Sequence, residues 1–366
     1  MRRHDIDWLR IGALVLLIVY HNVISFQPWA FTLLFIQNRE SMEWLWPVMS
    51  LINVWRIPIL FLISGMGVGF AMERRTWRQL VQDRVIRILV PLVFGFFFIC
   101  PVSILFALGY YGEELAYRSN AGHLWFLGNI FLYVVLLLPL LTYLQNRPEN
   151  RFLRLARWIF SRPLTLPLLA VPLMAETWIL DPQPFALYAQ TRHGFWLGLL
   201  CFFMGYTFVS MGELFWRAVA SARHGALTIA LIMALARVWV FSRTGEMGVL
   251  VALESMAWMM AILGYGCRHL NRPSSALTYL GQAVYPVYIL HMPVQFGLSY
   301  MVMQLNIWPQ VKLPILLAGT LAICLAIYQL ILKRARWVRP LLGMKMSMAG
   351  SPPARADAMR RPEVLL

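Results

Sequence analysis

Two polar residues capable of chemistry interrupt the first apolar stretch of the chain, which runs from Ile6 to Asn22. Arg10 and His21 are eleven residues apart. At ~3.6 residues per helical turn this is close to three turns, so both side chains leave one face of a helix, roughly 16 Å apart along its axis. A histidine can accept and return a proton near neutral pH. His21 is therefore a candidate base or a hydrogen-bonded core residue, and Arg10 is either functional or an interfacial residue that extends towards water.

A second histidine is expected at the same depth as His21. His291 ends the sequence Tyr-Pro-Val-Tyr-Ile-Leu-His and lies fourteen residues after Leu277, just as His21 lies fourteen residues after Asp7. Pro286 within this sequence removes a backbone hydrogen bond and bends the helix. Such a bend is tolerated inside a membrane where neighbours or a cavity satisfy the freed carbonyl group. The two histidines should therefore lie at similar depths.

One arginine falls near the middle of the second apolar stretch. Arg56 lies in residues 46–70, and no acidic residue in that stretch offsets its charge. Charged residues at this depth are costly and usually face a bundle interior or a wet cavity, so Arg56 either pairs with an acid elsewhere or lines a polar pocket. Farther along, Gly65 and Gly69 have the spacing that allows two helices to approach closely, which favours a packing role.

The remaining charged residues of the apolar stretches have structural interpretations. Arg84 and Arg87 lie one turn apart at the start of the third stretch. They either anchor the helix at the membrane surface or bind a phosphate-bearing donor, and spacing alone favours anchors. Arg237 and Glu254 could form an ion pair, and His193 is expected at a surface.

The composition indicates a membrane protein. Of 366 residues, 60% are hydrophobic and 13% are charged, and apolar runs of about 17–25 residues recur along the chain. The net charge of +16 could suggest nucleic acid, but the basic residues form short clusters between apolar runs, so we expect no nucleic-acid partner. Four cysteines at wide spacings predict neither a disulfide framework nor a zinc site. The histidines are not at ligand spacing with carboxylates, so we expect no metal.

We predict one all-α polytopic membrane domain, residues 1–343, with about ten transmembrane helices. The expected spans are 8–26, 46–70, 86–108, 123–144, 163–180, 194–210, 225–241, 248–266, 277–303 and 313–332. Arginine and lysine are concentrated in alternate connections, which places both termini in the cytoplasm by the positive-inside rule. No small-residue cleavage site follows the first span, so we expect it to be retained. The tail, residues 344–366, is expected to be a disordered cytoplasmic segment.

Five short motifs follow one another in a fixed order. They are Trp8-Leu9-Arg10 followed by His21, then Phe-Leu-Ile-Ser-Gly at 61–65, Arg84-x-x-Arg87-x-x-x-Pro91, His123-Leu124-Trp125-Phe126-Leu127, and Tyr-Pro-Val-Tyr-Ile-Leu-His at 285–291. Together they resemble the membrane-bound acyltransferase 3 family over about residues 5–332. The fourth motif looks more like the branch that succinylates periplasmic glucans than the branch with Trp-Ser-Leu-x-x-Glu, because Ile130 stands in place of that glutamate.

The resemblance implies an enzyme of a bacterial inner membrane. Family members move an acyl group, commonly acetyl or succinyl, from cytoplasmic acyl-CoA to a hydroxyl of a carbohydrate or lipid-linked glycan, often on the outer side. Carried over by position, it implies that His21 is catalytic and that Arg10 is its functional partner. Arg84 and Arg87 match the basic cytoplasmic motif of the family.

Acyl transfer to an alcohol needs a base, an oxyanion stabiliser and a site for the thioester donor. We predict that His21 is the base or a transient acyl carrier, that Arg56 stabilises the oxyanion, and that His291 or Tyr288 orients the acceptor. The residues predicted to bind the phosphates of CoA are Arg10, Arg84 and Arg87, because a guanidinium fork matches phosphate oxygens. The residues predicted to bind the acceptor substrate are His123, Trp125 and Asn22.

The rival hypothesis is a transporter or a flippase of lipid-linked sugars. In that case His21, Arg56 and His291 would form a proton or substrate path through the membrane. Against this hypothesis, the sequence has no inverted repeat of the kind that is common in secondary transporters.

Overall fold

The computed structural model describes residues 3–241 and 247–344, so the predicted tail from residue 345 lies outside the described residues. Over these ranges the protein is helical and has no β-strand. The long helices are α1 (His4–Ile24), α2 (Trp46–Met72), α6 (Trp125–Asn146), α9 (Arg192–Ser210), α10 (Glu213–Ala236), α12 (Gly248–His269), α13 (Ser275–Val302) and α14 (Pro309–Ile327). The shorter helices are α3 (Trp77–Arg84), α4 (Val90–Phe94), α5 (Cys100–Tyr111), α7 (Arg151–Phe160) and α8 (Val171–Leu180).

The helices confirm a polytopic membrane protein. Eight helical segments of the described residues are long and apolar enough to cross a membrane, including a continuous one from Trp77 to Tyr111. The two other expected spans are also helical. The segment Leu164–Leu180 is shorter than the eight, and α13 has 28 residues but carries polar side chains such as Gln282 and Gln295.

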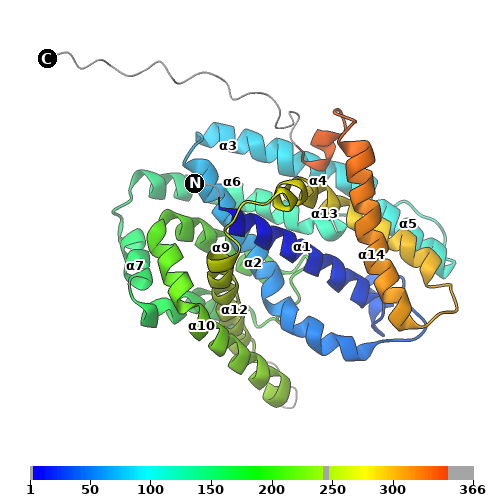
Figure 1. The fold of residues 1–366 in the computed structure, drawn as a ribbon, viewed down its shortest axis with the longest axis horizontal. Coiled ribbons are helices and arrows are strands. Elements are labelled where there is room, and N and C mark those ends of the chain that lie inside the picture. Colours follow the sequence, from blue (N-terminus) through cyan, green and yellow to red (C-terminus); the bar gives the residue numbers. More distant parts are fainter. Residues whose placement is uncertain (1–2, 242–246, 345–366) are drawn as a thin grey trace.

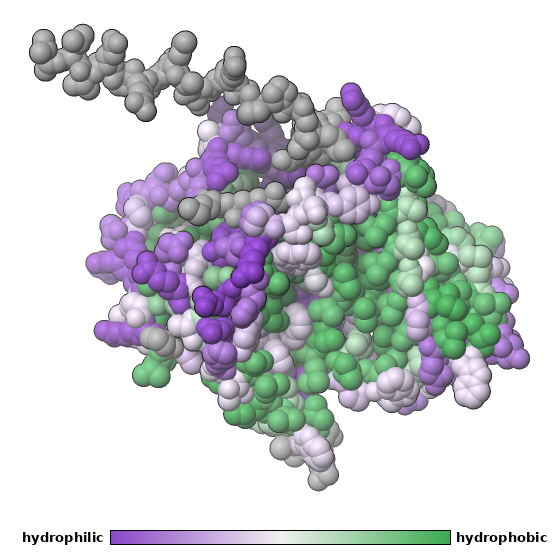
Figure 2. Space-filling model, in the orientation of Figure 1, coloured by the Kyte–Doolittle hydropathy of each residue, from purple (hydrophilic) through white to green (hydrophobic). Residues whose placement is uncertain are grey.

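Hydrophobic side chains are exposed over a large part of the outside of the bundle. Figure 2 shows them over α14, where Val311, Ile315 and Ile323 are exposed, and it shows hydrophilic residues gathered beyond the end of that helix. Such an apolar belt matches a lipid environment. Arg10 near the start of α1 and Gly343 after α14 line one cavity, so the two ends of the described chain lie on the same side of the bundle (Figure 1). This arrangement fits an even number of spans.

Close packing of α2 against α9 fixes the centre of the bundle. A Cβ atom added at Gly65 would collide with the backbone of Phe202, and one added at Gly69 would contact Val209 at 3.2 Å. A Cβ added at Gly205 of α9 would in turn collide with a backbone carbonyl of α2. The predicted packing role of Gly65 and Gly69 is therefore confirmed.

Arg237 and His193 each contact a buried glutamate. The Arg237 Nε atom lies 2.7 Å from Glu254 Oε2, so the predicted ion pair is confirmed. The expectation that His193 lies at a surface is wrong. Its side chain is 4% exposed and its Nδ1 atom lies 3.0 Å from Glu176 Oε1. The segment before α9 packs over this imidazole, where Phe185 and Tyr188 contact the ring.

Candidate active site

Helix α1 carries both of the first candidate residues. Arg10 and His21 lie on it together, as predicted, because α1 is continuous from His4 to Ile24. Arg10 pairs loosely with Asp7, one turn earlier, at 3.5 Å. His21 lies in the last turn of the helix.

Helix α13 brings His291 directly against His21. The Nδ1 atom of His21 lies 2.9 Å from the Nε2 atom of His291, within hydrogen-bond distance. The two imidazoles are nearly parallel, with an interplanar angle of 4° and ring centroids 5.2 Å apart. The prediction of similar depths is confirmed. His291 is fully buried, whereas His21 is partly exposed.

The hydrogen bonds assign the tautomers of this pair. The Nδ1 atom of His291 lies 2.6 Å from the carbonyl oxygen of Tyr288, which can only accept, so Nδ1 carries the proton in neutral His291. Its Nε2 atom must then accept, and Nδ1–H of His21 donates to it. The Nε2 atom of neutral His21 is therefore unprotonated and carries a lone pair. It has no hydrogen-bond partner among the described residues. His21 can therefore accept a proton at Nε2, as a general base must.

A third histidine completes the cluster. His123 lies just before α6, and its ring centroid is 4.9 Å from that of His291, edge to face. Its Nε2–H donates to the carbonyl of Ile289 at 3.1 Å. The Tyr288 hydroxyl donates to the backbone carbonyl of His123 at 2.7 Å. These bonds tie the start of α6 to α13. In the described residues no group of three histidines, cysteines or acids has a geometry that could hold a metal ion.

Arg56 is buried beside this cluster, and no acidic residue in the described part of the chain forms an ion pair with it. It is 2% exposed and its guanidinium carbon lies 3.9 Å from the centre of the Tyr20 ring. One Nη2 hydrogen bond, 2.9 Å long, reaches Asn53 on its own helix. Its Nε and Nη1 atoms have no partner in the part of the chain that the structure describes. Of the two interpretations from the sequence, pairing with an acid is therefore not found among the described residues, and two hydrogen-bond donors stay free.

A cavity of about 560 Å³ extends from an arginine cluster towards the histidines. Five arginines and one acid line it, namely Arg10, Arg74, Arg75, Arg84, Arg87 and Asp83. The Nε atoms of Arg84 and Arg87 have no partner in the described residues. The far part of the cavity is apolar and reaches Leu17 and Tyr288. Leu17 is one helical turn before His21, and Tyr288 is three residues before His291.

The predicted substrate-binding residues Trp125 and Asn22 both pack within the protein. Trp125 packs edge to face against Phe61, with ring centroids 6.1 Å apart. Asn22 is fully buried, and its Nδ2 donates to Ile18 O at 2.8 Å, whereas its Oδ1 has no partner among the described residues. Their contact with a substrate stays a prediction.

Sequence reasoning missed polar residues that complete the site. Gln295 lies one turn beyond His291, and its Nε2 donates to the backbone carbonyl of His21 at 2.9 Å. Tyr285 lines the cavity, and its buried hydroxyl has no partner in the described part of the chain. The helical spacing of Gln295 from His291 was a usable signal, because residues four apart share a helix face.

The comparison with known protein families agrees with the motifs. A model of the acyltransferase domain matches residues 3–329, nearly the whole chain. The chain therefore belongs to the acyltransferase 3 family, and it is a multi-pass membrane acyltransferase. Neither a curated protein nor a solved structure matched the chain.

Proposed function

We propose that this protein transfers an acetyl or succinyl group from cytoplasmic acyl-CoA to a hydroxyl of a carbohydrate or lipid-linked glycan at the outer side of a bacterial inner membrane. One observation carries the proposal. The free Nε2 lone pair of His21, fixed by the hydrogen bond to His291, lies one helical turn beyond the end of a cavity whose other end is lined by arginines. An oriented base next to a site suited to a phosphate-bearing donor fits acyl transfer.

The cavity suits a donor with anionic phosphates and a long apolar arm. From Arg10 to Leu17 is seven residues, or roughly 10 Å of helix, and His21 is roughly 16 Å from Arg10. In our proposal the arginine end faces the cytoplasm and binds the phosphates of CoA, while the pantetheine arm lies in the apolar part. The thioester would then reach the histidines from the cytoplasmic side.

In the direct mechanism, His21 acts as the base. Its Nε2 accepts the proton of the acceptor hydroxyl while the hydroxyl oxygen attacks the thioester carbonyl. The tetrahedral intermediate collapses with cleavage of the carbon–sulfur bond. The imidazolium then returns its proton to the CoA thiolate, which leaves as the free thiol.

In the stepwise mechanism, the same Nε2 atom attacks the thioester carbonyl itself. CoA leaves as the thiolate, and the acyl group is carried on His21 until the acceptor hydroxyl displaces it. Both routes give the same products. They differ in whether labelled acyl groups accumulate on the protein when no acceptor is present.

Arg56 is our candidate for the oxyanion stabiliser. It is on α2 and its guanidinium lies over Tyr20, the residue that precedes His21. Its Nε and Nη1 atoms, which have no partner among the described residues, are already buried, so they need no reorganisation as negative charge develops on the carbonyl oxygen. A fixed donor of this kind contributes about 3 kcal/mol to transition-state stabilisation.

A test of the donor site compares two kinds of charge removal. We expect the double variant Arg84→Gln/Arg87→Gln to raise the KM for acyl-CoA at least about tenfold, since each charge-assisted hydrogen bond contributes ~1.5–3 kcal/mol. The matched control is Lys333→Gln, which removes a basic residue outside the cavity. Consumption of acetyl-CoA and of succinyl-CoA by purified protein in lipid would be followed as free CoA. Equal KM values for both variants would mean that Arg84 and Arg87 only anchor the helix.

A further inference from the structure

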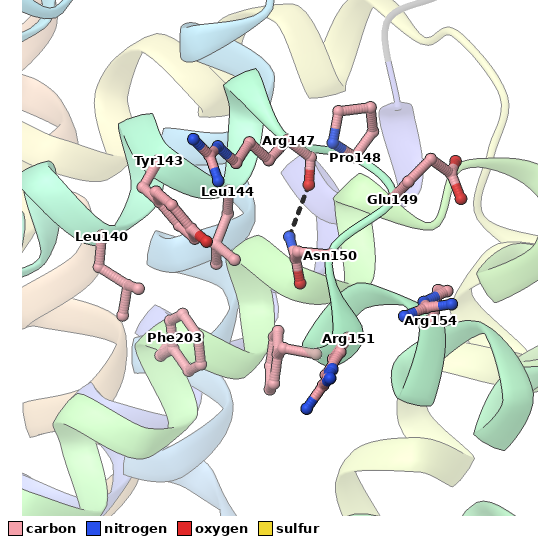
Figure 3. A pocket seen from close by; sticks show the side chains of 11 residues that line it. Leu140, Tyr143, Leu144, Arg147, Pro148, Glu149, Asn150, Arg151, Arg154 and Phe203 are labelled. Atoms are coloured by element: carbon pink, nitrogen blue, oxygen red, sulfur yellow. Dashed lines mark hydrogen bonds between the residues drawn. The ribbon is translucent and has the colours of Figure 1, made fainter.

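A second cavity lies away from the histidines. It has a volume of about 890 Å³ and is formed where α6 ends and α7 begins, next to α9. Figure 3 shows the loop between the two helices crossing the site, with the Nδ2 of Asn150 donating to the backbone carbonyl of Arg147 at 2.6 Å. This cavity has no part in the acyl transfer proposed above.

One wall of the cavity is apolar and open to the surroundings of the protein. Leu140, Tyr143 and Phe152 line it and are 41%, 49% and 41% exposed. The ring of Phe152 packs on Phe203 of α9, with centroids 5.3 Å apart. In Figure 3 the side chains of Leu140, Tyr143 and Phe203 lie to the left of the loop. On a membrane protein, exposed apolar side chains at a helix end face the acyl chains of lipids.

Three arginines surround the same cavity. Arg147, Arg151 and Arg154 line it, are exposed, and form no ion pair within the described residues. Arg147 lies above the Tyr143 ring, 5.3 Å from its centre. The one acid at the cavity, Glu149, points away from its centre in Figure 3 and binds Arg157 through both carboxylate oxygens at 3.0 Å. The cavity therefore presents net positive charge.

Helix α7 has the amphipathic character of a helix that lies in a membrane interface. Leu153, Ala156 and Phe160 pack against the protein. Phe152 and Leu155, three residues apart, form an exposed apolar side next to them. The basic residues occupy the third side. A short helix with this distribution lies along the headgroup region with its apolar side towards the acyl chains, which puts the cavity at that depth.

We propose that this cavity binds an anionic glycerophospholipid of the surrounding bilayer, in the cytoplasmic leaflet if the basic connections face the cytoplasm. Its phosphate binds at the positively charged rim of the cavity, where Arg147, Arg151 and Arg154 stand apart from one another in Figure 3. Its acyl chains lie along the wall formed by Tyr143 and Phe203. Basic pockets at the cytoplasmic ends of transmembrane helices bind headgroups of this charge. A free phosphate ion would use the arginines but would leave the apolar wall uncovered.

The test is a binding measurement that does not depend on catalysis. Full-length protein in detergent would be titrated with phosphatidylglycerol, with phosphatidylcholine, or with inorganic phosphate, and bound ligand would be counted by native mass spectrometry. The triple variant Arg147→Gln/Arg151→Gln/Arg154→Gln removes the proposed headgroup contacts. The control, Arg78→Gln/Arg334→Gln/Arg336→Gln, removes three exposed arginines that do not line the cavity.

We expect the wild type and the control to bind one phosphatidylglycerol at least about tenfold more tightly than phosphatidylcholine, and the cavity variant to lose this preference. Phosphatidylglycerol bound equally by both triple variants would overturn the proposal. Equal binding of both lipids by the wild type would also overturn it, because charge would then be irrelevant. Binding of inorganic phosphate as tight as that of phosphatidylglycerol would replace the lipid with a small anion. Equal thermal unfolding midpoints for the two variants would show that the comparison is between folded proteins.

Discussion

Replacement of His291 tests whether this residue positions the base. In the structure, His291 Nε2 accepts a hydrogen bond from Nδ1–H of His21 at 2.9 Å, and this bond leaves His21 Nε2 unprotonated. His291→Leu removes the acceptor and keeps an apolar side chain of moderate size. His291→Gln supplies an amide oxygen that can accept the same hydrogen bond. The two variants therefore separate loss of the acceptor from loss of the imidazole.

The expected decrease in kcat follows from the energy of the hydrogen bond between His21 and His291. In His291→Leu, His21 either keeps the proton on Nδ1 without a partner or moves it to Nε2, and in the second case the lone pair needed for catalysis is lost. An unsatisfied buried donor costs about 1–3 kcal/mol. Because 1.36 kcal/mol corresponds to a factor of ten in rate, we expect kcat to fall roughly 5- to 150-fold. The KM for acyl-CoA should stay constant, since His291 does not line the arginine cavity.

The assay is release of free CoA from acetyl-CoA or succinyl-CoA in the presence of a cell-envelope glycan fraction. His291→Gln should recover most of the activity that His291→Leu loses. A wild-type kcat for His291→Leu would refute the positioning role. Complete inactivation of both variants would also refute it, because His291 would then take part in the chemistry itself.

Two further predictions concern stability, and thermal unfolding in lipid measures both. Gly205→Ala should lower the unfolding midpoint, because the added methyl group collides with a backbone carbonyl of α2. Gly225→Ala should leave the midpoint unchanged, because its added Cβ has no atom within 4 Å. Equal midpoints for the two variants would mean that α2 and α9 can separate without cost. Glu254→Gln should destabilise by about 3–5 kcal/mol, because it leaves the largely buried Arg237 without its charge partner. Glu149→Gln breaks an exposed pair and should leave the midpoint unchanged, so similar losses for both glutamates would contradict this ranking.

The fold was predictable where physical constraints are local. A bilayer requires apolar helices of known length, so composition and apolar runs predicted the helical class and most of the spans. Counting residues along two spans was enough to place His21 and His291 at one depth. The glycines of α2 were predictable as packing residues for the same reason, because their spacing puts both on one helix face.

Tertiary contacts between distant segments were not predictable in this way. His123 follows a loop, and the direction of a loop is not set by periodicity, so its contact with His291 appeared only in the structure. His193 directly precedes the expected span 194–210 and was expected at a surface, yet the segment before it in the chain folds over it. Gly343 lies beyond the last span, and nothing in the tail indicated that it returns to line the arginine cavity near Tyr285.

The most direct test of the proposed function compares wild-type protein with His21→Ala. Both would be reconstituted in lipid and given radiolabelled acetyl-CoA or succinyl-CoA with a cell-envelope glycan fraction, after equal accumulation in the membrane is verified. We predict that the wild type labels the glycan and releases CoA, and that His21→Ala does neither. Normal transfer by His21→Ala would contradict the catalytic role of this histidine. If the wild type consumed neither thioester, acyl transfer from these donors would be excluded and the path through His21, Arg56 and His291 would have to serve transport.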